Sequence, residues 1–303
     1  MGGDLLVRGA VALARRLNVP PVVVAATVVG FGTSLPEMIV SIQATVSGVP
    51  DLILGNVVGS NIANVLLVGG ASAVVFPLLH DDRELRRNVV LMWGALLAFT
   101  AFAAMRSFST VDGVVLLVAF FVMMAATARS TLRARQESDP STPLDWVLGI
   151  PSRMIVIVMF IIVGIVMLPL GANLLVDSAV EIAERFEVPE AVIGLTILAV
   201  GTSLPELTTS VLAALEKRSD VAIGAIVGSN TFNILTIMGL TAAVSPAPIL
   251  VSNRMLFLDI PFMLVTSGAL GLAALRGRAV GRGVGIAMLV AYAAYLTTLA
   301  VIV

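Results

Sequence analysis

Two glutamates embedded in apolar stretches carry the clearest chemical signal in this sequence. Glu37 ends the hexapeptide GTSLPE at 32–37, and Glu206 ends the same hexapeptide at 201–206. A carboxylate midway through a membrane span costs at least about 2.5 kcal/mol and marks ion or proton pathways. No Lys or Arg lies at a matching depth. The pair predicts a site for one divalent cation, several monovalent cations or protons; the structural alternative is that each Glu is protonated and bonded to its own broken backbone.

Each hexapeptide also predicts a break in its helix. Gly and Pro weaken a helix interior, and Pro36 cannot donate a hydrogen bond to the preceding turn. Such a break is tolerated at membrane depth only where it is buried in protein or lines a cavity. It frees carbonyl oxygens near Gly30 and Ala199, where the helix dipole favours cations. Hydroxyl oxygens lie at the same level on Thr33, Ser34, Thr202 and Ser203.

A second repeated motif supplies further oxygen atoms. It reads GNVVGSNIAN at 55–64 and GAIVGSNTFN at 224–233. Ser60 and Asn64 are four residues apart and therefore share one helix face, as do Ser229 and Asn233. Together with the two carboxylates they form an all-oxygen set, which suits Ca²⁺ with its roughly 6–8 oxygen ligands. Softer metals prefer Cys or His, and the chain has no Cys and one His.

Further polar residues and the glycines of the second motif can serve as ligands or as packing residues. Asn61 and Asn230 are left open between ligand and interhelical hydrogen bond. Asp259 has no counterpart in the other copy and is interpreted as an interfacial or packing residue rather than a ligand. Close helix packing is predicted for the glycines Gly55, Gly59, Gly224 and Gly228.

The composition fixes the class of protein that holds these motifs. The chain of 303 residues is 58% hydrophobic and 12% charged, with a net charge of −1. Soluble domains are about 45–50% apolar and about 25% charged, so a soluble fold is excluded. The charge balance gives no basic field for nucleic acid. We predict an all-α polytopic membrane protein.

Ten apolar segments are long enough, or nearly so, to cross a bilayer. They are residues 2–16, 19–47, 51–77, 86–105, 110–129, 152–184, 189–215, 220–245, 253–275 and 283–303. The polar stretch between Arg129 and Asp145 separates two groups of five. We therefore expect a first five-helix repeat at 1–130, a cytoplasmic linker at 131–150 and a second repeat at 151–303.

Positive charge predicts the orientation of these segments. Fourteen Lys and Arg residues fall in the loops after the odd-numbered segments, against three on the opposite side, Arg106, Arg185 and Arg254. The central loop is expected to be cytoplasmic and both termini extracytoplasmic, in a plasma membrane.

Self-comparison reveals an internal repeat. With an offset of 169, residues 2–77 align without gaps to 171–246, and 32 of the 76 positions are identical. Because five spans is an odd number, the second copy is expected to be inverted, which is typical of transporters with a site at mid-membrane. The apolar run at 154–170 has no counterpart before Gly2, so the first helix is N-terminally truncated. Either the start was assigned too late or the protein lacks that half-helix.

GTSLPE followed by GSN-x-x-N in two inverted repeats resembles the calcium/cation antiporter superfamily, in particular the microbial type of the sodium/calcium exchanger family. The resemblance implies Glu37 and Glu206 as central acidic ligands of Ca²⁺, with Na⁺ in flanking sites. It implies alternating access in which the first and sixth helices slide as gates. Further oxygen ligands are implied at Thr33, Ser34, Thr202, Ser203, Ser60 and Ser229, with backbone oxygens at Gly30 and Ala199.

Asn233 departs from many microbial and potassium-dependent members, which carry Asp at that position. The Asn argues against K⁺ co-transport and leaves two formal negative charges at the centre. One Ca²⁺ is neutralised by that pair, whereas three Na⁺ leave an excess positive charge.

The leading hypothesis is a secondary antiporter that exchanges Ca²⁺ for Na⁺. The alternative is proton-coupled Ca²⁺ antiport, with the two Glu releasing protons when Ca²⁺ binds. A passive cation channel would use the same oxygen lining, and a membrane enzyme would need a nucleophile or base with an oriented partner. We expect no enzymatic activity, no cofactor, no nucleic acid and no obligate protein partner, with Ca²⁺, Na⁺ and the lipid bilayer as the interacting species.

Overall fold

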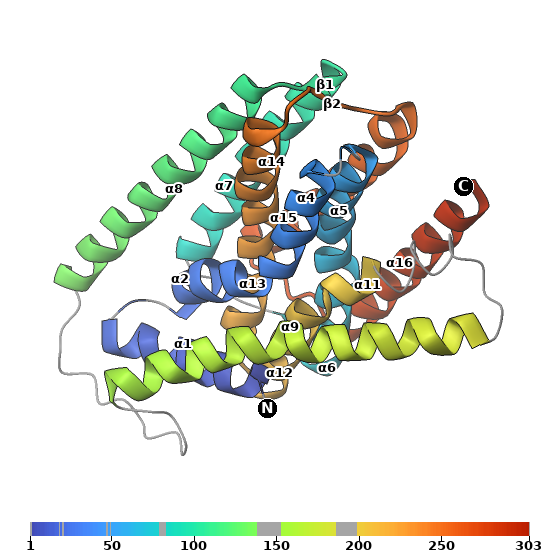
Figure 1. Ribbon diagram of the computed structural model, residues 1–303. Coiled ribbons are helices and arrows are strands. Elements are labelled where there is room, and N and C mark those ends of the chain that lie inside the picture. The colour runs from blue at the N-terminus through green and yellow to red at the C-terminus, as the bar shows by residue number, and fades with distance from the viewer. Residues whose placement is uncertain are drawn as a thin grey trace.

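The computed structural model describes residues 2–17, 19, 21–46, 48, 50–78, 83–137, 153–185 and 199–302, and helices dominate them (Figure 1). The first half contains α1 (Gly2–Leu17), α2 (Pro21–Val24), η1 (Ala25–Val29), α3 (Gly30–Thr33), α4 (Leu35–Val46), α5 (Pro50–Ala63), η2 (Asn64–Gly69), α6 (Gly70–Val75), α7 (Arg83–Ala104), β1 (Ser107–Phe108) and α8 (Thr110–Glu137). The second half contains α9 (Met154–Arg185), α11 (Ala199–Thr202), α12 (Leu204–Leu215), α13 (Ser219–Phe232), η4 (Asn233–Met238), α14 (Gly239–Val244), β2 (Ile249–Leu250), η5 (Met255–Asp259), α15 (Ile260–Leu275) and α16 (Arg282–Ile302).

Helices occupy the described part of every expected apolar segment. Seven of them are long and apolar enough to cross a membrane, and an eighth span is counted if a bent pair is one crossing. The predicted class, a helical polytopic membrane protein, is confirmed. One boundary differs, because α8 continues to Glu137 and enters the expected linker. Residues 130–137 include Leu, Ala, Gln, Glu and two Arg, which all favour helix.

The helix breaks expected at the two hexapeptides are present. Ser34 separates α3 from α4, and its backbone leaves the helical region at φ −86°, ψ 9°. The segments on either side, Ala25–Thr33 and Leu35–Val46, are bent by 49°. Ser203 separates α11 from α12 with nearly the same backbone angles, φ −87° and ψ 5°. Both prolines lie in the first turn of the following helix, where a missing N–H is harmless.

The two helices that carry the second motif form the centre of the molecule. In the span Ser219–Val244, 94% of the most apolar window is buried, and in Asp51–Val75 the buried share is 72%. Each span passes from α-helix into a short π-helix at the Asn that ends the motif, Asn64 or Asn233. The wider π turn shifts the side chains that follow it, and such bulges are frequent at functional sites.

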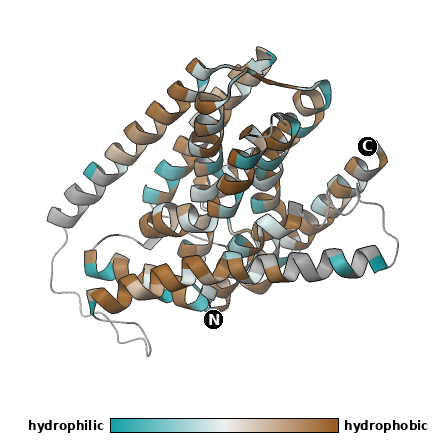
Figure 2. Ribbon diagram, viewed as in Figure 1, coloured by the Kyte–Doolittle hydropathy of each residue, from teal (hydrophilic) through white to brown (hydrophobic). Residues whose placement is uncertain are grey.

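The outer helices present apolar side chains to their surroundings. Figure 2 shows hydrophobic residues along most of α8 and α9. Large side chains on α8 and α9, such as Phe121 and Ile155, are exposed. An exposed apolar surface of this extent is expected for helices that face lipid.

Helix α9 crosses the lower part of the view alongside α1 (Figure 1). Glycines let the two backbones approach each other closely. A Cβ atom on Gly164 would lie 2.9 Å from the carbonyl oxygen of Gly2, and one on Gly9 would lie 2.8 Å from Ile161. A side chain at either of these two glycines would therefore clash with the opposite helix.

Two antiparallel pairings join the first half of the chain to the second. Strand β1 pairs with β2 in the register Ser107–Leu250 and Phe108–Ile249. Leu78, after α6, forms an isolated bridge with Val280, which precedes α16.

Candidate cation site

The two motif glutamates are both buried at the helix breaks. Glu37 lies in the first turn of α4 with 1% of its surface exposed, and Glu206 lies in the first turn of α12 with 2% exposed. The Oγ atom of Ser34 donates a hydrogen bond to Oε1 of Glu206 at 3.0 Å. The two hexapeptides, 169 residues apart in sequence, therefore meet in space.

Most of the carboxylate oxygen atoms at this meeting point lack partners. Within the described residues, neither oxygen of Glu37 accepts a hydrogen bond, and Oε2 of Glu206 accepts none. Leaving a buried polar group unsatisfied costs about 1–3 kcal/mol, and more if it is charged. The unpartnered oxygens are available to a cation or to protons.

Hydroxyl groups from both motifs surround the first break. The Oγ1 atom of Thr33 donates to the carbonyl of Val29 at 3.0 Å and lies 3.5 Å from Oγ of Ser229. The Ser229 hydroxyl in turn donates to the carbonyl of Gly30 at 3.3 Å. The predicted carbonyl ligand at Gly30 and the hydroxyls of Thr33 and Ser229 thus lie together.

Amide groups complete the buried polar cluster. The Nδ2 atom of Asn233 donates to Oγ of Ser60 at 2.9 Å. Both amide atoms of Asn64, Oδ1 of Asn233 and Oγ of Ser203 have no hydrogen-bond partner in the part of the chain that the structure describes. The unpartnered oxygen atoms among these groups are available to an ion.

Two predicted ligands are placed only by their position in the chain. Ala199 begins α11, and Thr202 ends it, one residue before Ser203. They occupy on the second break the places that Gly30 and Thr33 occupy on the first.

The donor set fits a hard cation. Among the described residues, no group of three or more His, Cys, Asp or Glu side chains could hold a metal ion. An ion at this site would therefore depend on two carboxylates assisted by hydroxyl, amide and carbonyl oxygens. That set matches the oxygen-rich, adaptable coordination of Ca²⁺.

Asn61 and Asn230 contribute to contacts between the central helices. The Nδ2 atom of Asn230 donates to the backbone carbonyl of Asn61 at 3.4 Å, which joins α13 to α5. The Nδ2 atom of Asn61 donates to its own helix, at the carbonyl of Val57. The interhelical hydrogen bond considered for these residues is present for Asn230.

The glycines of the second motif were predicted to serve close packing. A Cβ atom on Gly228 would lie 2.2 Å from the carbonyl oxygen of Ala26, so η1 crosses α13 in backbone contact there. At Gly55 and Gly59 an added Cβ would meet no atom of the described residues within 4 Å. The prediction of close packing is confirmed for Gly228, where η1 crosses α13. For Gly55 and Gly59 it stays a prediction, because residues 186–198, which match the segment that crosses Gly228, lie outside the described part of the chain.

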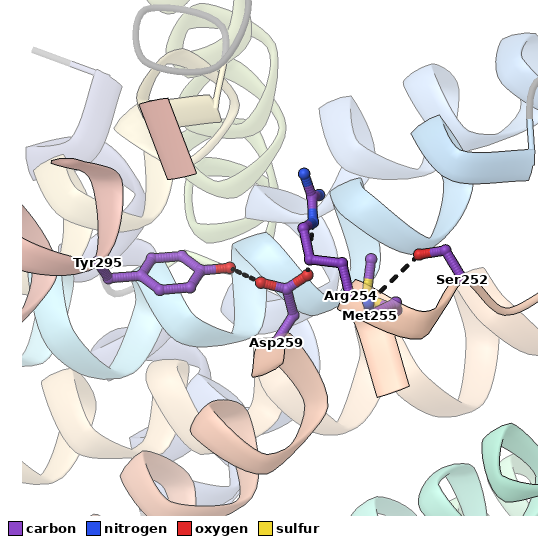
Figure 3. A network of polar contacts seen from close by, with 5 residues as sticks. All are labelled: Ser252, Arg254, Met255, Asp259 and Tyr295. Carbon is purple, nitrogen blue, oxygen red and sulfur yellow. Dashed lines mark hydrogen bonds and ion pairs between the residues drawn. The ribbon is translucent and has the colours of Figure 1, made fainter. Parts of the chain in front are cut away.

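Asp259 belongs to a separate polar network (Figure 3). Its carboxylate is fully buried, receives the Tyr295 hydroxyl at 2.9 Å and lies 3.2 Å from Nε of Arg254. The ring of Tyr295 stacks on Phe262 with a centroid distance of 4.9 Å. As expected for a packing residue, Asp259 ties α16 to the start of the ninth span.

One residue at the site has a role that was not predicted. The Nδ2 atom of Asn56 donates to the backbone carbonyl of Glu37 and to Oγ of Ser41, both at 2.8 Å. The sequence offered one indication of this role. Ala225 occupies the position that matches Asn56 in the repeat, so only the first copy has an amide there.

A bundle of membrane helices, broken at two buried carboxylates and lined with oxygen atoms, is the architecture of a cation transporter. The family model described as "Sodium/calcium exchanger protein" matches residues 1–128 and 156–301. The chain therefore belongs to the sodium/calcium exchanger family, whose members exchange cations, Ca²⁺ among them, across membranes.

Individual relatives agree with this assignment. The inner membrane protein YrbG of Escherichia coli (strain K12) is 33% identical over 98% of this chain and 91% of its own length. The sodium/calcium exchanger MaX1 of Methanosarcina acetivorans is 29% identical over 98% of this chain and 94% of its own. A solved structure of the sodium–calcium exchanger NCX_Mj, soaked with Na⁺ and Ca²⁺, superposes with a TM-score of 0.83 at 31% identity, covering 98% of this chain and 93% of that one.

Proposed function

We propose that this protein is a secondary antiporter that exchanges Ca²⁺ for Na⁺ by alternating access, with the transported ions held between Glu37 and Glu206. The observation that carries the proposal is the hydrogen bond from Ser34 to Glu206, which joins the two hexapeptides at their buried helix breaks. The carboxylate oxygens left unpartnered there would be ligands of the ion.

In this proposal Ca²⁺ occupies the centre and Na⁺ ions use flanking oxygen atoms. The two carboxylates would ligate Ca²⁺ directly. The neutral oxygens would come from hydroxyls, amides and carbonyls of both motifs: Thr33, Ser34, Ser60, Asn64, Thr202, Ser203, Ser229 and Asn233, with backbone oxygens at Gly30 and Ala199.

The formal charge of the site matches one Ca²⁺ ion, and the absence of a third carboxylate supports exchange that does not require K⁺. Two carboxylates balance one Ca²⁺, whereas three Na⁺ would leave one positive charge in a buried place, where uncompensated charge is costly. Asn233 uses its amide to donate to Ser60 and adds no third carboxylate. Exchange is therefore expected to continue when K⁺ is replaced by choline.

The proposed architecture is ten spans in two inverted five-helix repeats, with the central linker cytoplasmic and both termini outside a plasma membrane. Matching helix breaks at Ser34 and Ser203 support the repeat. Matching π-helices that begin at Asn64 and Asn233 support it as well. The crossing of α1 and α9, where glycines bring the two backbones close together, is the contact along which these helices would slide as gates.

The test is ion flux in proteoliposomes that contain the purified protein. Vesicles loaded with Na⁺ are diluted into Na⁺-free buffer, and entry of ⁴⁵Ca²⁺ is followed for the wild type, Glu37→Gln and Glu206→Gln. Glu181→Gln, at an exposed glutamate of α9, is the matched control. Uptake that requires internal Na⁺ and is lost in both site variants, but not in the control, supports the proposal.

A second arm replaces the Na⁺ gradient with a pH gradient. Uptake driven only by the pH gradient would transfer the assignment to proton-coupled Ca²⁺ antiport. Uptake that needs neither gradient and does not saturate would indicate a passive channel.

A further inference from the structure

The two copies of the site are tied to their neighbouring helices in different ways. In the first copy, Asn56 on α5 donates to the carbonyl of Glu37 and to the hydroxyl of Ser41, so its amide holds one turn of α4. That turn carries the Glu37 carboxylate, which is buried and accepts no hydrogen bond from the described residues. The position of this carboxylate is thus determined through its backbone.

The hydrogen bonds of Asn56 to α4 are part of a longer series that crosses the centre of the molecule. The Ser60 hydroxyl donates to the backbone carbonyl of Asn56 at 2.6 Å. The same hydroxyl accepts from Nδ2 of Asn233 at 2.9 Å. A continuous chain of hydrogen bonds therefore runs from the Glu37 turn through α5 to the second half of the protein.

The matching residues of the second copy form no such chain. Helix α12 packs on α13 as α4 packs on α5, but the position matching Asn56 is Ala225, which has no amide. Ser210, the match of Ser41, is buried and its Oγ has no hydrogen-bond partner among the residues that the structure describes. Asn64, the match of Asn233, leaves both amide atoms unpartnered there.

We propose that Asn56 is a positioning residue for the cation site, which fixes the Glu37 half through the backbone of α4, while the Glu206 half is left without an equivalent tie. This inference rests on the proposed function, since it assumes that Glu37 is an ion ligand. The consequence is a site whose two halves differ in stiffness. Cation affinity is expected to depend on Ser41, which accepts the hydrogen bond from Asn56, and not on its match Ser210.

The test compares matched variants of the two copies in the purified full-length protein. Asn56→Ala removes both hydrogen bonds to the Glu37 turn and is expected to raise the Ca²⁺ dissociation constant about five- to tenfold, the size of one to two net hydrogen bonds. Ser41→Ala removes one of the two acceptors and is expected to raise it about threefold. Ser210→Ala, the matched control, is expected to leave it unchanged.

Two measurements separate positioning from a general loss of structure. Calorimetric titration with Ca²⁺ gives the dissociation constant, and ⁴⁵Ca²⁺ flux gives the half-saturating concentration and the maximal rate. A positioning role raises the dissociation constant and the half-saturating concentration together, with the maximal rate nearly kept. Ala225→Asn in the Asn56→Ala background supplies an amide beside Ser210 and is expected to recover part of the affinity.

Equal effects of Ser41→Ala and Ser210→Ala would overturn the inference, as would an Asn56→Ala protein with a lower melting temperature and unchanged Ca²⁺ affinity. If the wild type itself bound no Ca²⁺, the proposed function would fail instead. The two failures are therefore distinguishable within one set of titrations.

Discussion

Ser34 donates its hydroxyl hydrogen to Oε1 of Glu206 at 3.0 Å, whereas Ser203, at the matching position of the repeat, gives no such bond to Glu37 in the described chain. The two carboxylates therefore differ in the hydrogen bonds that they accept before an ion binds. Glu206 has one oxygen already oriented by a hydroxyl, and Glu37 has both oxygens unpartnered.

The first prediction concerns this pair of serines. Ser34→Ala removes a hydrogen bond to a carboxylate, which is worth about 1.5–3 kcal/mol, and the loss should weaken Ca²⁺ binding by at least about tenfold. Ser203→Ala is the matched control and should change binding less, because its hydroxyl orients no carboxylate in the structure. Titration of the two purified variants checks this, and a larger loss in Ser203→Ala would contradict it.

The second prediction follows from the crossing of η1 and α13. In Gly228→Ala the new Cβ would lie 2.2 Å from the carbonyl oxygen of Ala26 and 2.5 Å from its Cα, so the backbones must separate. We expect loss of exchange and a lower melting temperature. The control is Gly59→Ala, at the matching position, where no atom of the described residues lies within 4 Å of the added Cβ. It should be tolerated or stabilise the helix by about 0.5–1 kcal/mol, and equal damage from both changes would show that the crossing is not responsible.

A third prediction concerns the network around Asp259. Tyr295→Phe keeps the stack on Phe262 but removes the hydroxyl that donates to the buried carboxylate, at a cost of about 1.5–3 kcal/mol in the free energy of unfolding. Arg254→Gln should cost more, because it leaves a buried charge without its counter-ion. Thermal unfolding in detergent measures both, and Tyr292→Phe, which leaves both contacts of Asp259 in place, is the control. Ca²⁺ affinity should not change in any of the three.

The fourth prediction is a dependence of stability on pH at the end of α12. Burial raises the pKa of the Glu216 carboxyl, with Asp4 adding to the rise and the guanidinium groups of Arg8 and Arg218 opposing it. The folded protein therefore holds this proton more tightly than the unfolded chain does. The stability from the protonated group is present below the unfolded pKa and is lost as pH rises through the folded pKa.

Glu216→Gln removes this titration. Compared with the wild type, the variant should lose less stability as pH rises from about 4 to about 8, and the difference should be small because the carboxylate is partly exposed. Melting temperatures of both proteins across that range measure it. Parallel curves would show that another group is responsible.

Much of the fold and several features of the site were predictable from residue types alone. Pro36 and Gly32 in an apolar span predict a helix break whatever the tertiary structure, and the break lies at Ser34. The buried position of Glu37 and Glu206 follows from the length of apolar sequence on either side of them. These are local properties of the chain, so the residue types and their positions in the sequence were sufficient to predict them.

Features that depend on how helices cross were not predictable. The sequence around Gly228 does not reveal that the backbone of η1 passes directly over it. Asn56 donates to a carbonyl on a different helix, and no spacing along the chain encodes that distance. The extension of α8 to Glu137 was missed because polar composition suggested a linker, although the same residues are good helix formers.

The pairings of β1 with β2 and of Leu78 with Val280 bear on how the protein is made. Each joins a segment synthesised early to one synthesised late, so the first half enters the membrane before its partners exist. Contacts of this kind slow assembly, because distant segments must meet before they stabilise one another. During that interval the carboxyl group of Glu37 lacks the span Ser219–Val244, whose segments η4 and α14 pack on α4. A chain that ended between the halves would therefore be an incomplete bundle in which this carboxyl group is left unshielded.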